Sequence, residues 1–330
     1  MKMLIAGLGS IGRRHLRNLR TLGQEEIILY RTHKATLPDA ELSELPNFTE
    51  LRLALDEKPD GVIVANPTAL HLDVAIAAAK AGAALLIEKP ISDGLAGLGE
   101  LQSVLNLSGK PAMVGFHFRF HPVLNQVKAL LESGQLGKPL SARAHWGEYL
   151  PDWHPWEDYR RSYAARADLG GGVVNTLSHP LDYLRWLLGE VESVNAWTGR
   201  LSELELDVED HAEVLLRFTA GKTASVHLDY YQRPPSHTLE ITCEGGRICW
   251  DNATGEARVF HAQSDVTDLL VPPEGFERNQ MFIDEMETFV RLCEGETLPH
   301  CTLTDGIRAQ KLVLAIKQSA AQDGCMVSLA

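Results

Sequence analysis

A glycine-rich turn directly after the first apolar run places the strongest constraint on the fold of this chain. Met3–Ala6 is apolar throughout, as a buried strand is, and residues 7–12 read G-L-G-S-I-G. A G-x-G-x-x-G between a strand and a helix is typical of a dinucleotide-binding βαβ unit. Gly7 would permit the tight turn, Gly9 the approach of a pyrophosphate, and Gly12 the close packing of helix on strand.

The helix that follows this turn would complete a phosphate site. Its first residues, Ser10 and Ile11, would direct backbone N–H groups and the positive end of the helix dipole at a pyrophosphate. Glycines also form turns that hold no ligand, but a strand before and a helix after are the context that the motif requires. We therefore predict a dinucleotide site at residues 7–12.

Apolar runs and helical patterns alternate over residues 1–118. The runs are apolar on both faces, as strands of a parallel sheet covered by helices are. The predicted strands are Met3–Ala6, Ile27–Tyr30, Gly61–Ala65, Ala84–Ile87 and Ala112–Gly115, and the predicted helices are Ile11–Leu22, Ala69–Ala81 and Gly94–Leu107. The pattern indicates an α/β fold with an N-terminal Rossmann domain, a doubly wound parallel sheet.

Residues 119–330 follow a different pattern, which indicates an α+β domain with a largely antiparallel open sheet. Its helices are predicted at 122–132, 280–293 and 304–322, and the last can pack back on the first domain. Its strands are predicted at 210–219, 223–231, 238–243 and 247–251.

An open face that is apolar requires a partner. Tyr230 and Trp250 are candidates for that face, so we expect a homodimer or homotetramer through the sheet.

The end of the second predicted strand bears on the choice of nucleotide. NAD-binding domains place an acidic residue there for the ribose 2′-hydroxyl, whereas this chain has Arg31, with Thr32 and Lys34 close by. A guanidinium is suited to a 2′-phosphate, which favours NADP over NAD as the cofactor. Arg31 could instead stack on the adenine or point to solvent, and both alternatives stay open.

Three further segments follow predicted strands or begin a helix. The first is Asn66-Pro67, with His71 shortly after it; the second is Glu88-Lys89-Pro90; the third is the run from Gly170 to Asp182, which contains Asn175 and His179. With the glycine turn, they resemble in order and spacing the Gfo/Idh/MocA oxidoreductases, in which E-K-P is followed by D-x-x-x-H-x-x-D. The resemblance spans nearly the whole chain, and it implies that Asn66, Pro67, His71, Glu88, Lys89 and Pro90 line the cofactor.

Lys89 is the first catalytic candidate that the resemblance implies, placed beside the nicotinamide ring by a cis bond before Pro90. The chemistry supports this role, because a hydroxyl group that loses hydride from its carbon must also lose its proton to a base. His179 is the second candidate. At helical spacing, Asn175, His179 and Asp182 would share one face, and Asp182 could orient His179.

Asn175 departs from the family pattern, which has Asp at this position. An amide can bind substrate or orient a histidine, but it cannot carry a proton. Proton transfer is therefore assigned mainly to Lys89. The predicted substrate ligands are Asn175 and His179 together with Arg119, Trp153 and Tyr163, of which the last two lie in a loop rich in aromatic and polar residues. Such a loop suits a sugar or cyclitol, and Arg160 and Arg161 suit an acidic one.

Composition excludes several other functions. Acidic residues outnumber basic ones by 44 to 31, and the net charge of −13 repels nucleic acid. No apolar run reaches the roughly 18 residues of a membrane helix. The five cysteines form no C-x-x-C pair, and His117 and His121 alternate with phenylalanine as in a strand, so we predict no metal ligand and a cytoplasmic protein.

These features predict an NAD(P)-dependent enzyme that transfers hydride to or from a hydroxyl or keto group of a sugar, nucleotide-sugar or cyclitol. Three alternatives stay open. The resemblance also covers redox-neutral sugar enzymes that hold their nucleotide tightly and enzymes that reduce double bonds. A regulatory protein that binds a dinucleotide without turnover has the same fold, although the presence of both Lys89 and His179 argues against it.

Overall fold

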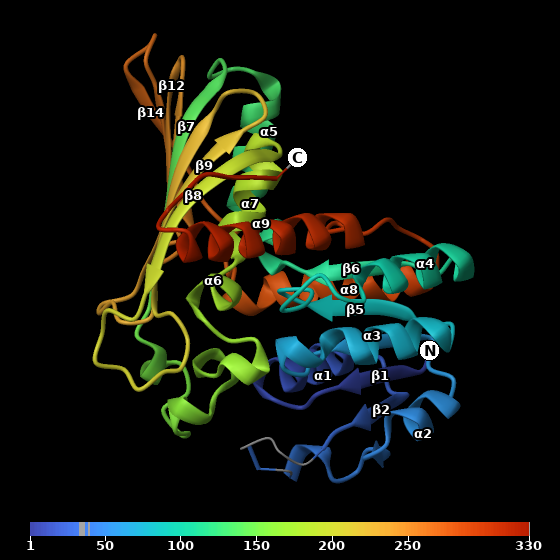
Figure 1. Ribbon diagram of the computed structural model, residues 1–330. Helices are drawn as coiled ribbons and strands as arrows, with labels where there is room; N and C mark the ends of the chain where they lie inside the picture. Colours follow the sequence, from blue (N-terminus) through green and yellow to red (C-terminus); the bar gives the residue numbers. More distant parts are fainter. Residues whose placement is uncertain (33–36, 39, 330) are drawn as a thin grey trace. The chain divides into compact units, whose positions relative to one another are not determined.

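The computed structural model (Figure 1) describes residues 1–32, 37, 38 and 40–329. The chain forms two compact units. Unit one contains Met1–His117, Asp168–Gly170 and Glu277–Gln310, and unit two contains Phe118–Ala167, Gly171–Phe276 and Lys311–Ala330. Within the described residues, no helix combines the length and apolar character needed to cross a bilayer.

Unit one is built on a six-stranded sheet in the order β3-β2-β1-β4-β5-β6, and every adjacent pair is parallel. This is the strand order of the Rossmann fold, as predicted. The bounds are β1 Met3–Ala6, β2 Ile27–Tyr30, β3 Asn47–Phe48, β4 Gly61–Val64, β5 Ala84–Glu88 and β6 Ala112–Gly115. β1, β2 and β6 have the predicted bounds to the residue.

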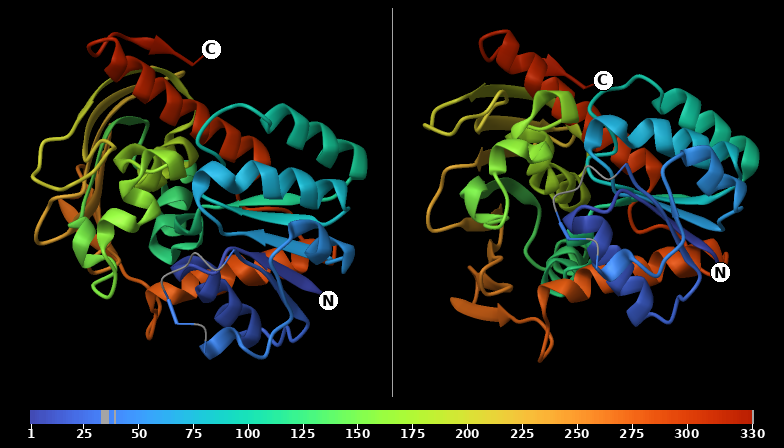
Figure 2. Two further views of the ribbon diagram at one scale, coloured as in Figure 1. Left: turned by 60° about the horizontal axis from the view of Figure 1, so that its bottom comes forward. Right: turned by 90° about the horizontal axis from the view of Figure 1, so that it is seen from below.

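Helices cover both faces of this sheet, which explains why its strands are apolar on both sides. Figure 2 shows α3 and α4 on one face and α1 and α8 on the other. The helices and 3₁₀ turns of the unit are α1 Ser10–Thr21, η1 Ala40–Leu42, α2 Leu51–Asp56, η2 Thr68–Leu70, α3 His71–Lys80, α4 Leu98–Ser108, α8 Arg278–Cys293 and the start of α9, Leu303–Ala321. The buried core includes Leu4, Val62, Val64, Leu85 and Ile87.

The topology brings three predicted segments to one edge of this sheet. β1 ends before Gly7, β4 ends before Asn66, and β5 ends at Glu88, next to Lys89. Because β1, β4 and β5 are adjacent and parallel, their carboxyl ends lie side by side. The carboxyl edge of an open α/β sheet is where such folds bind ligands.

Unit two contains a nine-stranded sheet in the order β14-β13-β12-β11-β7-β10-β9-β8-β15, antiparallel except for the parallel pair β7 and β10. Its strands are β7 Pro139–Gly147, β8 Val191–Gly199, β9 His211–Phe218, β10 Thr223–Asp229, β11 Ser236–Cys243, β12 Gly246–Asp251, β13 Glu256–His261, β14 Val266–Leu270 and β15 Val327–Ser328. The unit also contains α5 Pro122–Ser133, α6 Val173–Thr176, α7 His179–Leu188, the rest of α9 and short 3₁₀ turns at 150–152, 159–161 and 163–165.

The expectation that Tyr230 and Trp250 contribute to the open face is wrong. Their side chains are 0% and 1% exposed, and both belong to the core of unit two. The outward side chains of the sheet are mixed in character, with Trp197, Leu215 and Phe260 exposed among polar groups. A homodimer or homotetramer through this face stays a prediction.

Two local predictions are also wrong. His117–Phe120 forms a 3₁₀ turn, η3, and not a strand. The continuous helix expected to carry Asn175 and His179 on one face is instead two helices, because α6 ends at Thr176 and α7 begins at His179. Pro180 explains the interruption, since proline has no backbone N–H to donate and favours the first turn of a new helix.

Candidate functional site

The glycine turn has the close approaches that its spacing predicts. Gly7 has a φ of +97°, and a Cβ on it would collide with the backbone of Ala65 and Asn66. A Cβ on Gly12 would overlap the carbonyl oxygen of Gly7, whereas a Cβ on Gly9 would meet open space. Two of the glycines therefore pack backbone on backbone, and Gly9 leaves room for a ligand.

The N-terminus of α1 faces this turn without a side-chain cap. The helix begins at Ser10 after Gly9, which has no side chain to cap it, and its first turn holds no acidic residue. Ser10 and Ile11 thus contribute backbone N–H groups at the positive end of the helix. The turn and the helix start together fit the phosphates of a dinucleotide.

Arg13 fastens the glycine turn to the segment after β2, a role that the sequence analysis missed. Its side chain is 3% exposed, and Nε donates to the carbonyl oxygen of Leu8 at 3.0 Å. Its Nη1 and Nη2 donate to the carbonyl oxygens of Pro38 and Leu37 at 2.6 and 3.1 Å, and Nη1 lies 3.0 Å from a Glu41 carboxylate oxygen. An arginine directly after the motif was the available signal, but its burial is visible only in the structure.

Arg31 lies directly after β2, where the ribose of a dinucleotide is expected. Its backbone N–H donates to the carbonyl oxygen of Phe48 at 3.0 Å, and the residue is 7% exposed. Thr32 is exposed, and Lys34 lies outside the described residues. The proposed contact of Arg31 with a 2′-phosphate stays a prediction.

His71 joins the turns that follow β4 and β5. Its Nε2 lies 2.8 Å from the carbonyl oxygen of Asn66, and its Nδ1 lies 3.0 Å from that of Pro90. Burial lowers the pKa of His71. Asn66 also donates from Nδ2 to the carbonyl oxygen of Leu70 at 2.9 Å. His71 is therefore a positioning residue that holds the Asn66-Pro67 and Lys89-Pro90 turns together.

Glu88 is anchored from the opposite side by α1. Its carboxylate lies 2.6 Å from Nε2 of His15, which is fully buried, and it also accepts the backbone N–H of Lys89 at 3.2 Å. Burial works to raise the pKa of Glu88, but the hydrogen bond and charge of His15 outweigh it and the net shift is downward. These contacts favour a supporting role for Glu88 beneath Lys89 over direct contact with a cofactor.

Glu285 on α8 completes this buried cluster. Donor atoms of His15, Glu88 and Glu285 lie within 4.8 Å of one another, and Glu285 is 0% exposed. Neither of its carboxyl oxygens has a hydrogen-bond partner among the described residues. Burial, followed by the charge of Glu88, raises the pKa of Glu285 well above its ordinary value. The raised pKa favours the protonated form of Glu285, and the lowered pKa of Glu88 favours its charged form.

Lys89 stands at the end of β5 with its side chain half-buried. The Lys89–Pro90 peptide bond is cis, as the resemblance implies. The residue thus follows a rigidly held strand end, with Glu88 fixed by His15 on one side of it and Pro90 fixed by His71 on the other.

In unit two, Asn175 and His179 are deeply buried, at 2% and 1% exposed. Asn175 donates from Nδ2 to the carbonyl oxygen of Gly171 at 3.2 Å. The His179 ring meets Phe118 edge-on, with centroids 4.9 Å apart, and lies 5.7 Å from the Trp146 ring. Aromatic packing thus fixes the orientation of the histidine, and its catalytic role stays a prediction.

Asp182 binds Arg119 within the same unit. Its two oxygens accept from Nη2 and Nε of the guanidinium at 2.7 and 2.9 Å, and the residues are 2% and 5% exposed. A bidentate buried ion pair of this kind holds η3 against α7. Asp182 therefore has a structural partner in Arg119, and the predicted contact of Arg119 with a ligand stays a prediction.

The aromatic loop of unit two is partly committed to internal contacts. Trp153 packs edge-on against Tyr230, with centroids 5.5 Å apart, and Tyr163 begins a short 3₁₀ turn. Arg160 pairs with Asp158 and Glu205 at 2.8 and 2.7 Å, so two carboxylates already neutralise the charge proposed for an acidic substrate. Substrate contacts of Trp153 and Tyr163 stay predictions.

His117 and His121 have structural roles. The His117 ring stacks on Phe282 with centroids 4.1 Å apart. Nδ1 of His121 accepts the backbone N–H of Val123 at 3.2 Å and caps α5. Burial lowers the pKa of His121 to about 4, so the ring is neutral and its nitrogen is free to accept.

Comparison with known proteins identifies the family. Residues 1–116 match the family described as oxidoreductases with an NAD-binding Rossmann fold, and residues 124–249 match the Gfo/Idh/MocA C-terminal domain. The chain belongs to the Gfo/Idh/MocA family of oxidoreductases.

Relatives of this Gfo/Idh/MocA protein align over most of its length. It is 27% identical to myo-inositol 2-dehydrogenase of Thermotoga maritima, covering 97% of this chain and 96% of the relative. It is 26% identical to D-xylose 1-dehydrogenase (NADP⁺) 2 of Haloferax volcanii, covering 84% and 82%. A solved levoglucosan dehydrogenase, in complex with NADH and levoglucosan, shares the fold at a TM-score of 0.87, with 21% identity over 100% of this chain and 99% of that one.

Replacing Glu285 by Gln should change how the stability of the protein depends on pH. The folded state retains a proton on Glu285 that the unfolded chain loses above the ordinary pKa of 4.5, so this group makes the folded state less stable as pH rises from 4.5 towards the raised value. Glu285→Gln removes this pH-dependent decrease in the stability of the folded state. Between about pH 5 and pH 8, we expect its unfolding free energy relative to wild type to rise by up to about 1.4 kcal/mol per pH unit over the part of the range that lies below the raised pKa of Glu285.

Urea unfolding across this pH range measures the effect. Glu287→Gln on the exposed side of α8 is the matched control, and it should follow the wild type at every pH. A Glu285→Gln profile parallel to that of the wild type would show that Glu285 is ionised in the folded protein.

Asp182→Asn should destabilise the protein by about 3–5 kcal/mol, because it leaves the buried Arg119 guanidinium without its counter-charge. A double-mutant cycle with Arg119→Met, followed by urea unfolding, separates this cause from general disruption. If the pair is structural, the double variant loses less stability than the sum of the single variants, by at least about 1 kcal/mol. Additive losses would contradict the assignment.

Proposed function

We propose that this protein is an NAD(P)-dependent dehydrogenase that acts on a CH–OH group of a sugar or cyclitol, with NADP favoured. The observation that carries the proposal is the shared edge of unit one, where the glycine turn, the Asn66-Pro67 turn and Lys89 follow adjacent parallel strands. The named activities of the relatives on myo-inositol and D-xylose support the substrate class.

The residues of the edge fit a dinucleotide. Gly9 and the first turn of α1 would hold the pyrophosphate, because open space and backbone N–H groups meet there. Arg31 would hold the 2′-phosphate, and Asn66 and Pro67 would border the nicotinamide ribose. When bound, the nicotinamide accepts hydride from the substrate carbon or returns it.

Lys89 would accept or donate the proton that is transferred together with this hydride. In the oxidative direction its neutral amine accepts the proton of the substrate hydroxyl as the carbonyl forms, and in the reductive direction its ammonium donates that proton back. His71 and Glu88 hold the two sides of the Lys89 turn in place. His179 is proposed as the second group on the substrate, with Asn175 as a neutral hydrogen-bonding neighbour.

Lys89→Met should strongly reduce turnover and leave cofactor binding intact. Removal of the proton acceptor is expected to lower kcat by about 10²–10⁴-fold. Nicotinamide absorbance with a panel of sugars, nucleotide-sugars and cyclitols measures turnover, and fluorescence titration measures binding. Lys80→Met, at the exposed end of α3 in the same unit, is the matched control and should retain full activity.

The same experiment separates the alternatives. Nucleotide binding without turnover on any substrate, in the wild type as in the variant, would support a regulatory protein. A nucleotide that co-purifies, is reduced once by substrate and is not released would support a redox-neutral enzyme. Unchanged turnover in Lys89→Met would contradict the role of the lysine itself.

Arg31→Ala should weaken NADP much more than NAD. A guanidinium that pairs with the 2′-phosphate contributes only to the phosphorylated nucleotide, so the ratio of the two dissociation constants should shift by about tenfold or more. Arg52→Ala, an exposed arginine on α2 that pairs with Asp56, serves as the control. Equal weakening of both nucleotides would mean that Arg31 stacks on the adenine or supports the loop.

A further inference from the structure

The register of three strands in unit two gathers histidines and carboxylates on the open face of its sheet. His145 on β7 lies opposite His227 on β10, and His227 lies opposite Glu213 on β9. Two residues along β10, Asp229 lies opposite Gly147 of β7. His145 and His227 alternate with the buried residues of their strands, so they project from the face away from the core. Asp229, on the same side of β10, is 1% exposed.

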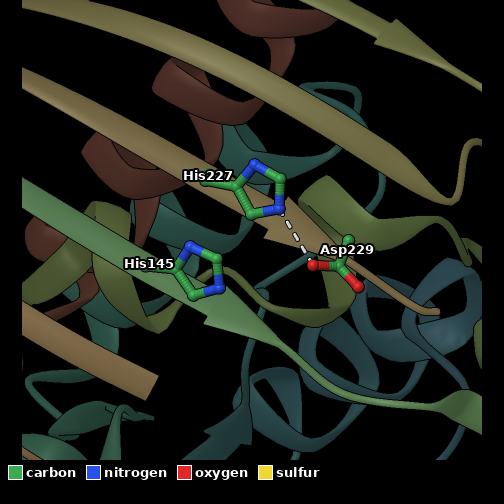
Figure 3. A group of neighbouring side chains, drawn as sticks. All are labelled: His145, His227 and Asp229. Atoms are coloured by element: carbon green, nitrogen blue, oxygen red, sulfur yellow. Dashed lines mark hydrogen bonds and ion pairs between the residues drawn. The ribbon is translucent and has the colours of Figure 1, made fainter. Parts of the chain in front are cut away.

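Nitrogen and oxygen donors converge in this cluster (Figure 3). Nε2 of His227 lies 2.9 Å from Oδ2 of Asp229, and the donor atoms of His145, His227 and Asp229 all lie within 4.8 Å of one another. The two imidazole rings stack with centroids 4.5 Å apart and planes 8° apart. Nε2 of His145 lies 2.6 Å from Oε1 of Gln232, which brings a fourth donor to the group.

Gly147 makes room for the oxygen donors. A Cβ at this position would overlap both Oδ2 of Asp229 and Oε1 of Gln232. The two oxygens therefore converge on the space that a larger residue would fill. A glycine opposite a buried carboxylate leaves the carboxylate and the amide free to meet the histidines.

The orientation of the ligands is fixed by further hydrogen bonds. Oδ1 of Asp229 accepts the backbone N–H groups of Tyr231 and Gln232 at 2.9 and 2.7 Å, which leaves Oδ2 directed at the cluster. Oε1 of Glu213 lies 2.6 Å from Nδ1 of His227, which leaves Nε2 directed at the cluster. A carboxylate that holds the far nitrogen of a histidine is the usual support of a metal-binding imidazole.

We propose that His145, His227 and Asp229 bind a divalent first-row transition-metal ion such as Zn²⁺, with the amide oxygen of Gln232 as a fourth ligand. Imidazole nitrogen with carboxylate oxygen is a donor set that zinc accepts, and the two carboxylates of Asp229 and Glu213 offset the charge of the ion. Ligands about 2.0–2.2 Å from a tetrahedral ion lie roughly 3.4 Å apart. Nε2 of His227 and Oδ2 of Asp229, now 2.9 Å apart, must therefore separate slightly, and donor pairs that lie up to 4.8 Å apart must close by on the order of 1 Å. Rotation of the half-buried His145 ring supplies such a movement.

The site is reachable from solvent. A surface hollow of about 740 Å³ is lined by residues that include His145 and Gln232, so an ion can approach the site from this side. A bound ion would link β7, β10 and the segment after β10. It would therefore add stability to unit two by binding the folded state alone.

Metal titration of the full-length protein tests the proposal. After removal of metals with a chelator, Zn²⁺ is titrated in competition with a chromophoric chelator, and Co²⁺ is added separately to record its visible spectrum. We expect one ion per chain, a four-coordinate Co²⁺ spectrum and a higher melting temperature with Zn²⁺. His145→Gln should weaken Zn²⁺ at least about tenfold and remove the thermal shift, and Glu213→Gln should weaken it about 10–100-fold.

His261→Gln is the matched control, because His261 also pairs with a carboxylate, Asp268 at 2.9 Å, on the same sheet. This variant should bind Zn²⁺ as the wild type does. Equal binding by wild type and His145→Gln would place the ion elsewhere and overturn the proposal. So would Zn²⁺ binding no tighter than that of exposed histidines.

Discussion

Backbone packing between the first helix and two strand ends is the constraint on which the rest of unit one depends. Gly12 allows α1 to approach Gly7, and Gly7 allows its turn to press against Ala65 and Asn66. His71 contacts the carbonyl oxygens of Asn66 and Pro90, and His15 of α1 contacts the carboxylate of Glu88. These contacts connect α1, the Asn66-Pro67 turn and the turn that carries Lys89. A side chain added at Gly7 or Gly12 would therefore displace all three.

This buried arrangement also includes an electrostatically unfavourable group. Glu285 enters the buried cluster without a hydrogen-bond partner among the described residues, and an unpaired buried carboxyl lowers stability at neutral pH. Its protonation keeps the cluster from holding two negative charges, because ionising it beside Glu88 would place like charges a few ångströms apart. The single charge on Glu88 lies next to the backbone of Lys89. Exceptions to ordinary core chemistry of this kind are expected next to functional sites.

The sequence was sufficient for features that depend on local pattern. Strands buried on both faces, such as β1 and β2, stand out as short apolar runs, and the glycine spacing predicts the packing of α1. Contacts between distant residues were not predictable: His15 and Glu88 are separated by 73 positions. Alternation misled at His117–Phe120, where the aromatic residues fill a 3₁₀ turn, while Pro180 was a visible signal for the end of a helix that helical spacing outweighed.

The sheet of unit two shows why alternation of apolar and polar residues identifies a strand but does not identify its buried face. Alternation reveals that a strand has two faces, but only packing decides which face is inside, and so Trp250 was assigned to the wrong side. The same register governs both faces of β7. Trp146 points into the core and stacks on His237 at 4.2 Å, so its neighbour His145 must project outward, opposite His227. A slip of one residue would exchange them, so the aromatic core that holds His179 also sets the position of the proposed metal ligands.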